Sequence, residues 1–361
     1  MFSFNQLHTV QIEITNKCQA SCPMCLRNIH GGIDNPNLIL TDWSLEQFKN
    51  TFAVEVLNQI KCVNFCGDYG DPIINSDLLD MCRYLRETSP DISVILHTNG
   101  SARSKGWWAN LAISLPDNHR VIFALDGLED THHLYRIGTS FETIIENARS
   151  FILAGGNAEW MFIRFKHNQH QVEEARTMSM NIGFKKFSTK DSKRFGKTFP
   201  VLDRTGSISY YIDPPSNSDI KPVEFLDLKD YKQWTNDVSC FANDSKELYI
   251  DANGYLMPCC LIGSFLYANY DIDLYRRYSV IDETSIVGIA REVQLEVFSI
   301  IRELGGIDSL DSKIHSIKDI MNTEIWQTLI HKKWEEFSSS TCKILCGGPF
   351  IKIAEQINRT S

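Results

Sequence analysis

The sequence contains neither a signal peptide nor a membrane-spanning segment. Its first residues, MFSFNQ, have neither the positively charged segment nor the apolar run of a secretory signal. No apolar run approaches the roughly 18 residues that a helix needs to cross a bilayer. We therefore expect a cytoplasmic protein that has no membrane partner.

Positive charge is also scarce. The chain has 36 Lys and Arg against 45 Asp and Glu, which gives a formal net charge of −9. Since a broad nucleic-acid-binding surface needs the opposite sign, we do not expect nucleic acid as a partner. The 43% hydrophobic content is that of an ordinary globular chain.

Cysteine, by contrast, is abundant, with 11 in 361 residues. In a chain without a secretory signal, this number indicates metal ligands or catalytic thiols rather than disulfides. Cys18, Cys22 and Cys25 fall in one segment, CQASCPMC, with the spacing C-x3-C-x2-C. Thiolates are soft ligands that suit iron–sulfur clusters, zinc or copper(I). A zinc site or an ordinary cubane takes four ligands, so three thiolates leave one metal position open.

Predicted strands and helices alternate over residues 8–195. The predicted strands cover 10–14, 61–65, 93–97, 120–125, 159–165 and 184–188. Helices are predicted from residue 44 onward and over 76–87, 105–111, 141–153 and 171–181. Such alternation indicates a parallel α/β sheet. Its active site would lie at the carboxyl ends of the strands, where the cysteine segment also falls.

The cysteine segment resembles the cluster loop of the radical S-adenosylmethionine (radical SAM) enzymes. The resemblance implies that Cys18, Cys22 and Cys25 hold a [4Fe–4S] cluster whose open iron binds S-adenosylmethionine (SAM). It implies reductive cleavage of SAM to a 5′-deoxyadenosyl radical that abstracts hydrogen, and a flavodoxin- or ferredoxin-type electron donor. The implied fold is a partial (β/α)6 TIM-type barrel. The alternative is an open doubly wound sheet.

Two segments resemble the parts of this family that surround SAM. The segment FCGDYGDP resembles the glycine-rich GGEP motif, which implies SAM contacts for Gly67, Tyr69, Gly70 and Asp71. Asp71 stands where the family has a longer Glu. The turn HTNG resembles the family's TNG turn and implies that Asn99 lies near SAM. Without the resemblance, the first segment would be interpreted as a Gly/Asp turn.

A third segment, VIFALDG at residues 121–127 followed by THHLYR at residues 131–136, resembles the strand-four motif SxDG…H…R of peptide-maturing members of the family. It implies that Asp126 lies in the SAM site and that Arg136 pairs with the SAM carboxylate. A guanidinium suits such a bidentate contact. Ala124 replaces the motif's Ser, so that hydroxyl contact is missing. The alternative for Arg136 is a surface ion pair with Glu129 or Asp130.

A second set of cysteines follows far along the chain. The spacing Cys240-x13-Gly254-x4-Cys259 resembles the opening of the SPASM and twitch extensions, which hold an auxiliary [4Fe–4S] cluster. The better match is a twitch domain, with a cluster held by Cys240, Cys259, Cys342 and Cys346. Cys260 is the alternative to Cys259, and a four-cysteine zinc site is the alternative to the cluster.

These observations divide the chain into three expected parts. Residues 1–195 would form the radical SAM barrel, and residues 196–239 an irregular, proline-containing connection. Residues 240–361 would form a small α+β twitch domain. A hairpin is predicted around Asn253-Gly254, and helices over 287–304 and 316–337.

The substrate is less clearly indicated. Arg164, Lys166, His167 and Lys190 follow late strands and would face the substrate, or else be solvated loop residues. Cys66 ends a strand and is a candidate hydrogen donor. One hypothesis is oxidation or epimerisation of a small sugar- or nucleotide-like molecule; no peptide-recognition domain is expected before the first strand. A second is modification of a peptide side chain, and a third is a non-catalytic Fe–S or zinc protein.

Overall fold

A computed structural model describes residues 2–192, 198–216, 240–264, 266–267, 286–303, 305–324, 326–327, 342 and 346. The chain forms two compact units. The first comprises residues 1–12, 46–63 and 225–361, and the second residues 13–45 and 64–224. The expected domain boundaries stay a prediction. Within the described residues, no helix has the length and apolar character needed to span a membrane.

The second unit is built on four neighbouring parallel strands. They are β5 (Ser93–Thr98), β6 (His119–Ala124), β7 (Ala158–Arg164) and β8 (Lys186–Asp191). Their apolar and β-branched residues suit a strand, and Val94, Leu96, Val121 and Phe123 are fully buried. Because the strands run in the same direction, their carboxyl ends meet at one edge, where the loops of the candidate site begin.

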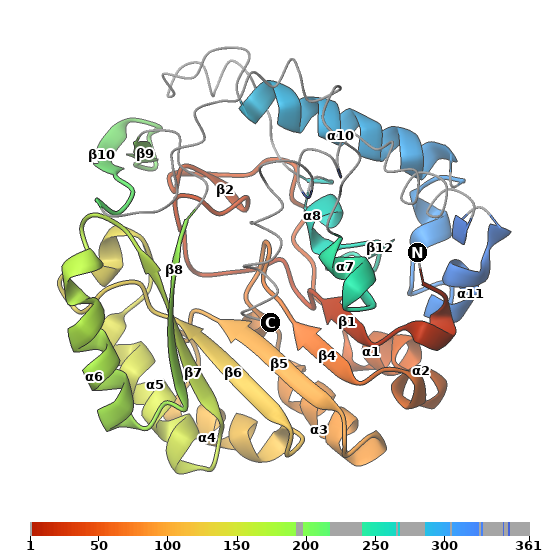
Figure 1. Ribbon diagram of the computed structural model, residues 1–361, viewed down its shortest axis with the longest axis horizontal. Coiled ribbons are helices and arrows are strands. Elements are labelled where there is room, and N and C mark those ends of the chain that lie inside the picture. Colours follow the sequence, from red (N-terminus) through yellow and green to blue (C-terminus); the bar gives the residue numbers. More distant parts are fainter. Residues whose placement is uncertain are drawn as a thin grey trace. The chain divides into compact units, whose positions relative to one another are not determined.

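Helices cover one face of these strands (Figure 1). They are α3 (Leu78–Thr88), α4 (Lys105–Ser114), α5 (Phe141–Leu153) and α6 (Val172–Ile182). Ser104 and Ser140 cap α4 and α5 by accepting bonds from the N–H groups of Trp107 and Thr143. Trp108 and Phe151 contact each other edge to face and fill the layer between helices and strands.

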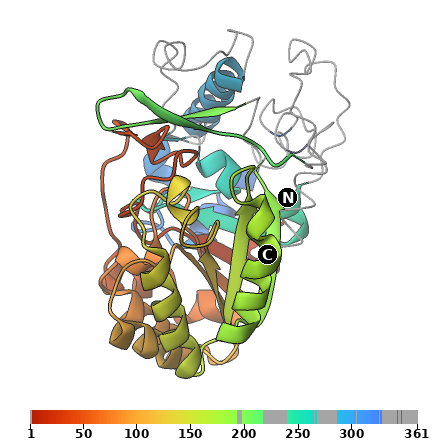
Figure 2. The same ribbon diagram turned by 90° about the vertical axis from the view of Figure 1, so that its left-hand side faces the viewer.

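Two small antiparallel hairpins belong to the same unit (Figure 2). The first pairs β2 (Asn28–Ile29) with β3 (Ile33–Asp34), and the second pairs β9 (Phe199–Leu202) with β10 (Ile208–Ile212). The Leu202 N–H donates to the His30 carbonyl over 2.9 Å and joins the two hairpins. The short 3-10 helices η2 (Pro72–Ile74), η3 (His132–Leu134) and η4 (Gln169–Gln171) lie in the loops.

In the first unit, β1 (Thr9–Ile12) pairs in parallel with β11 (Glu247–Ile250), which pairs antiparallel with β12 (Leu256–Met257). The predicted hairpin is therefore confirmed, with Gly254 at φ +100° in its turn. The helices are η1 (Phe4–Gln6), α1 (Leu45–Thr51), α2 (Val54–Gln59), α7 (Phe241–Asp244), α8 (Cys260–Gly263), α10 (Ile286–Glu303), η6 (Ile307–Leu310) and α11 (Ile317–Asn322).

The main sheet has the strand order β12-β11-β1 in the first unit and β5-β6-β7-β8 in the second, and the boundary between the two units falls within β4 (Cys62–Phe65). The sheet is mostly parallel and open, as in a partial TIM-type barrel. The expected fold class is thus confirmed. The parallel pairing of β11 with β1 was not expected, because nothing in a strand's own residues specifies a partner so distant in sequence.

Several local predictions were wrong. The helix expected from residue 44 is two helices, because Ala53 has extended backbone angles that separate α1 from α2. Residues 199–212 are a hairpin rather than irregular: Val201 and Ile212 bury apolar side chains, and Gly206 at φ +83° permits the turn. The strand expected over residues 184–188 is β8, which begins at Lys186 and ends at Asp191. Of the helix predicted over 316–337, the structure has α11 (Ile317–Asn322), whereas residues 325 and 328–337 lie outside the described residues.

Candidate functional site

The three cysteines of the CQASCPMC segment lie on one loop of the second unit. Cys22 is buried, whereas Cys18 and Cys25 are half-buried. A 3.0 Å bond from the Cys25 N–H to the Cys22 carbonyl closes a turn between them. The loop packs against a hydrophobic cluster made of Ala20, Cys22, Met24, Tyr135, Phe165, Val201 and Ile212. This packing holds the loop in place, with Cys22 inside the hydrophobic cluster and with Cys18 and Cys25 packed against it.

The electrostatics of the loop suit a bound metal cluster. Burial raises the pKa of the Cys18 thiol, and the nearby charges of Asp71, Cys22 and Cys25 raise it further. A bound metal cation favours deprotonation of such a thiol, because the cation stabilises the thiolate. No described group of three or more Cys, His, Asp or Glu is arranged to hold a single metal ion. In a cubane each thiolate binds a different iron, so the three-thiol donor set fits that cofactor.

Asn99 contacts the first of these thiols. Its Nδ2 lies 3.5 Å from Cys18 Sγ, and its Oδ1 accepts a 2.7 Å bond from Gln19 Nε2. The Ala20 N–H also points to Cys18 Sγ, at 3.4 Å. Amide groups therefore stabilise charge on this sulfur. The expected place of Asn99 near SAM stays a prediction.

Arg136 lies beside the second thiol. Its Nε donates to Asp126 Oδ2 over 2.6 Å, and its NH1 lies 3.8 Å from Cys22 Sγ. The Arg136 side chain is 15% exposed and Asp126 is fully buried. The alternative of a surface ion pair with Glu129 or Asp130 is wrong, because the guanidinium pairs with the buried Asp126 instead.

Residues 67–71, GDYGD, form a second loop of the site, the glycine-containing loop. It lies close to the third thiol, with Cys25 Sγ 3.8 Å from the Asp68 carbonyl oxygen. Glu13, which is buried, accepts bonds of 2.5 and 2.7 Å from the N–H groups of Tyr69 and Gly70. A Cβ on Gly70 would lie 2.0 Å from the Thr15 carbonyl oxygen, so only glycine fits there. The sequence interpretation missed Glu13, whose only signal was a carboxylate at the end of an apolar strand.

Asp71 connects this loop to the TNG turn. Its carboxylate accepts bonds from the Asn99 N–H, the Thr98 hydroxyl and the Ile73 N–H. Asp71 is 4% exposed, and burial raises its pKa to about 6. Since both oxygens of Asp71 already accept hydrogen bonds, its side chain positions the two loops.

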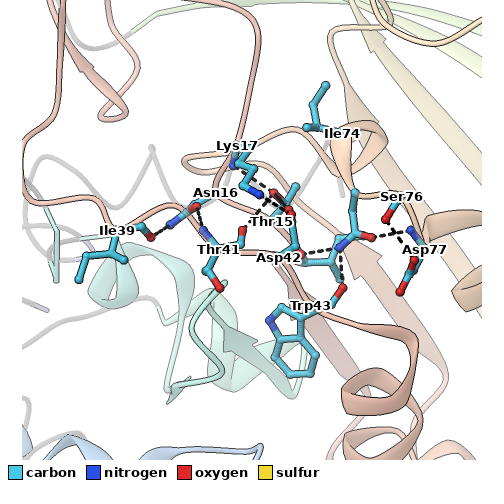
Figure 3. Close-up of polar contacts among 12 residues, drawn as sticks. Thr15, Asn16, Lys17, Ile39, Thr41, Asp42, Trp43, Ile74, Ser76 and Asp77 are labelled. Carbon is cyan, nitrogen blue, oxygen red and sulfur yellow. Dashed lines mark hydrogen bonds and ion pairs between the residues drawn. The ribbon is translucent and has the colours of Figure 1, made fainter.

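A polar network secures the backbone that leads into the cysteine loop (Figure 3). Thr15 Oγ1 and Lys17 Nζ both donate to Asp42, over 2.6 and 2.5 Å. The Asn16 side chain donates to the Ile39 carbonyl and accepts from the Thr41 N–H, each over 2.8 Å. Because these partners are more than twenty positions away in sequence, no local pattern indicates the network.

The expected substrate residues lie in differing environments. Arg164 forms a bidentate ion pair with Asp191 on β8, at 2.7 and 2.8 Å. Lys166 pairs with Asp213 at 3.3 Å, and both side chains are exposed. Lys190 is exposed on β8. Its charge acts on His97: burial of the His97 ring, with the charges of Lys190 and Arg120, lowers the pKa of His97 to about 4.

His167 and Cys66 are less exposed than those cations. The His167 ring stacks on Phe165 with centroids 5.2 Å apart, so it contacts the cluster that supports the cysteine loop. Burial lowers the His167 pKa to about 4. Among the described residues, its buried Nε2 has no hydrogen-bond partner. Cys66 is 4% exposed, in the segment between β4 and the glycine-containing loop.

The second cysteine set gathers in the first unit. Cys240, Cys259, Cys342 and Cys346 are all buried, whereas Cys260 is half-buried. Burial raises the pKa of the Cys259 thiol, and Cys260, Cys346 and Cys240 raise it further. Burial and Cys240 likewise raise the pKa of Cys346 to about 12. Both thiols are thus harder to deprotonate than an isolated cysteine, and the finding that no described group of Cys, His, Asp or Glu is arranged to hold a single metal ion applies to this set as well.

Comparisons with known proteins identify the fold. No family model and no curated protein matches the chain. Among solved structures, Streptococcus suis SuiB bound to the precursor peptide SuiA is similar over 97% of this chain and 73% of its own, with a TM-score of 0.55 and 15% identity. SuiB bound to S-adenosylmethionine is similar over 97% and 75%, with a TM-score of 0.53 and 14% identity. The fold implied by the resemblance to radical SAM enzymes is therefore confirmed.

Proposed function

We propose that the chain is a radical SAM enzyme. The observation that carries the proposal is the environment of the three thiols: Asn99 Nδ2 lies 3.5 Å from Cys18 Sγ, and Arg136 NH1 lies 3.8 Å from Cys22 Sγ. Hydrogen-bond donors around a three-thiol loop suit an anionic cluster with one open metal position. Similarity to a fold solved with S-adenosylmethionine supports the same cofactor here.

In this proposal Cys18, Cys22 and Cys25 hold a [4Fe–4S] cluster. A cluster bound there would supply the electron for reductive cleavage of SAM, whose products would be methionine and a 5′-deoxyadenosyl radical able to abstract hydrogen from a substrate. The chain's own residues bind and orient SAM. The N–H donors of Arg136 that Asp126 does not use are suited to the SAM carboxylate.

The glycine-containing loop would receive the other end of the SAM amino acid. Gly67 and Gly70 have no side chain, so a ligand can approach the backbone closely there. Glu13 accepts a hydrogen bond from the Gly70 N–H, and Asp71 accepts one from the Asn99 N–H, so both carboxylates hold the backbone of the site in place. Backbone carbonyls of residues 67–70 would then accept bonds from the SAM amino group, with Tyr69 packed behind them at 2% exposure. Asp71 acts as a positioning residue rather than as a direct ligand.

Paramagnetic resonance of the reduced protein tests this proposal. The protein is reconstituted anaerobically with iron and sulfide, reduced with dithionite, and measured with and without SAM. SAM binding at an open iron changes the signal of that cluster. A signal from the Cys18–Cys25 loop that SAM leaves unchanged would instead favour a non-catalytic iron–sulfur protein.

The second cysteine set is proposed to hold an auxiliary [4Fe–4S] cluster. Four buried thiols supply a complete donor set, so this cluster would have no open iron for substrate. Its role would be electron transfer or structural support. Metal analysis distinguishes it from a zinc site of the same four cysteines.

Two substrate classes remain candidates. A peptide is favoured by similarity to SuiB, whose structure was solved with a precursor peptide. A small anionic sugar- or nucleotide-like molecule, which would be oxidised or epimerised, is favoured by Lys190 and by the half-buried His167, whose Nε2 lacks a partner among the described residues. Where a product radical must be quenched, Cys66 is the proposed hydrogen-atom donor; this transfer would leave a thiyl radical at Cys66, and one electron from the external electron donor together with a proton would restore the thiol.

Isotope transfer distinguishes the two classes. Candidate peptides and small molecules deuterated at carbon are incubated with the reduced holoenzyme and SAM, and the recovered 5′-deoxyadenosine is analysed by mass. Deuterium in 5′-deoxyadenosine identifies the compound from which hydrogen was abstracted. With a Cys66→Ala variant, 5′-deoxyadenosine should still acquire deuterium, because hydrogen abstraction from the substrate comes before hydrogen is returned to it. The same variant should form no epimerised product, because the proposed donor of the returned hydrogen is missing.

A further inference from the structure

Asp126 and Arg136 form a buried ion pair beside the cluster loop. Asp126 Oδ2 accepts from Arg136 Nε over 2.6 Å, and Asp126 Oδ1 accepts from the Ile163 N–H, also over 2.6 Å. Each carboxylate oxygen thus has a strong donor. Asp126 is fully buried, so water does not screen its charge.

The other end of the pair points to a thiol. Arg136 NH1 lies 3.8 Å from Cys22 Sγ, so carboxylate, guanidinium and sulfur form a series of alternating charge. The backbone of the pair is held as well: the Asp126 N–H donates to His132 Nδ1 over 3.3 Å, and the Arg136 carbonyl accepts from Thr139 Oγ1 over 2.7 Å. The series is therefore fixed from both sides.

We infer that the Asp126–Arg136 pair sets the reduction potential of the cluster bound at Cys22, with Arg136 raising it and Asp126 restraining that effect. This inference rests on the proposed function. One electron from a chemical reductant enters the cluster, and no bond forms or breaks. A nearby positive charge stabilises the additional negative charge, and a nearby negative charge opposes it. The nearer guanidinium has the larger effect.

The two members of the pair must therefore shift the potential in opposite directions. Arg136→Gln should make the potential more negative, whereas Asp126→Asn should make it more positive. The double variant should lie below the wild type, because the nearer charge dominates. Arg136→Lys, which keeps a positive charge but loses the forked geometry, should shift the potential less than Arg136→Gln.

A purely structural role makes a different prediction. If the pair only supported the loop, its variants would lower the amount of bound cluster without opposite shifts in potential. Midpoint potential does not depend on how much of the sample carries the cluster, so partial loading does not obscure the comparison. Arg83→Gln, which breaks an exposed ion pair with Asp80 on α3, is the matched control and should leave the potential unchanged.

The experiment is a redox titration of the reconstituted protein without SAM, followed by paramagnetic resonance. The relevant signal is assigned by its loss in Cys18→Ala. Opposite shifts for Arg136→Gln and Asp126→Asn are expected. Equal potentials, or shifts of the same sign, in samples that contain the cluster would overturn the inference. A wild type that binds no cluster at Cys18, Cys22 and Cys25 would overturn the proposed function itself.

Discussion

Asp71 accepts a hydrogen bond from the backbone N–H of Asn99, with 2.7 Å between Oδ2 and N. Asn99 in turn places its amide 3.5 Å from Cys18 Sγ. A buried carboxylate in one loop thus fixes the residue that contacts a thiol in another. The shorter side chain at this position, where the GGEP motif has Glu, is suited to bonding the chain's own backbone.

We predict that Asp71→Ala destabilises the apo-protein by about 1–3 kcal/mol, the usual cost of leaving buried donors without an acceptor. The Asn99 N–H and the Thr98 hydroxyl would both lose their partner. Denaturant unfolding measures this change. The matched control is Asp80→Ala, which removes an exposed carboxylate on α3 and should change stability by less than about 0.5 kcal/mol. Equal effects of the two substitutions would contradict the role assigned to Asp71.

Iron analysis tests the two cysteine sets. The reconstituted protein should contain about eight iron atoms per chain, because each cubane holds four. Changing Cys18, Cys22 or Cys25 to Ala should leave about four, since the second set remains. Cys62→Ala, which removes a half-buried cysteine outside both sets, should retain the full content. About four iron atoms together with one zinc in the wild type would replace the auxiliary cluster with a zinc site.

Neighbouring cysteines allow a paired test of the auxiliary ligands. Cys259→Ala should lose the auxiliary cluster, because Cys259 is buried and interacts with both Cys240 and Cys346. Cys260→Ala should keep it, since Cys260 is half-buried at the start of α8. Iron content and the visible spectrum report the outcome. Loss of the cluster in Cys260→Ala alone would reverse the assignment.

Acid should destabilise the protein partly through His132. Its Nδ1 accepts from the Asp126 N–H, and burial, with Arg136 and His133, lowers its pKa from 6.5 to about 3. The unfolded chain therefore gains a proton first as the pH falls, and stability present above pH 6.5 is lost on acidification. The loss between pH 6.5 and 5 should be about 1.6 kcal/mol, because the unfolded histidine is already half protonated at pH 6.5.

Comparison with His132→Gln isolates this contribution. The variant should show a shallower decline of unfolding free energy over that pH range, whatever its stability at pH 7. His8→Gln, a substitution of the same kind at the exposed histidine directly before β1, is measured alongside as the control. Parallel slopes for wild type and His132→Gln would show that His132 does not titrate in this way.

Local sequence patterns predicted the parts of the fold that depend on local chemistry. Alternating strands and helices gave the parallel sheet, and Asn253-Gly254 gave the hairpin between β11 and β12. The hairpin of β9 and β10 was missed, because Pro200 and the prolines that follow at 214 and 215 suggested an irregular segment. What stabilises it is burial of Val201 and Ile212 against the cysteine loop, a contact that its own residues do not specify.

In the candidate site, too, some residues could be predicted from the sequence, whereas the contacts between them could not. The thiols could be identified from their spacing, and Asp126 and Arg136 from a resemblance. Their mutual ion pair could not, because sequence spacing does not specify which side chains meet. Glu13 and Gln19 were missed for a related reason: each acts on a loop more than fifty positions away. Long-range polar contacts of this kind leave no periodic signal.

The most direct test of the account is the formation of 5′-deoxyadenosine. The reconstituted protein is reduced with dithionite in the presence of SAM, and the products are separated and quantified. Wild type should produce 5′-deoxyadenosine and methionine, whereas Cys18→Ala, Cys22→Ala and Cys25→Ala should produce none above the protein-free background. Absence of 5′-deoxyadenosine from fully reconstituted, reduced wild type, or its continued formation by any of the three variants, would contradict the account.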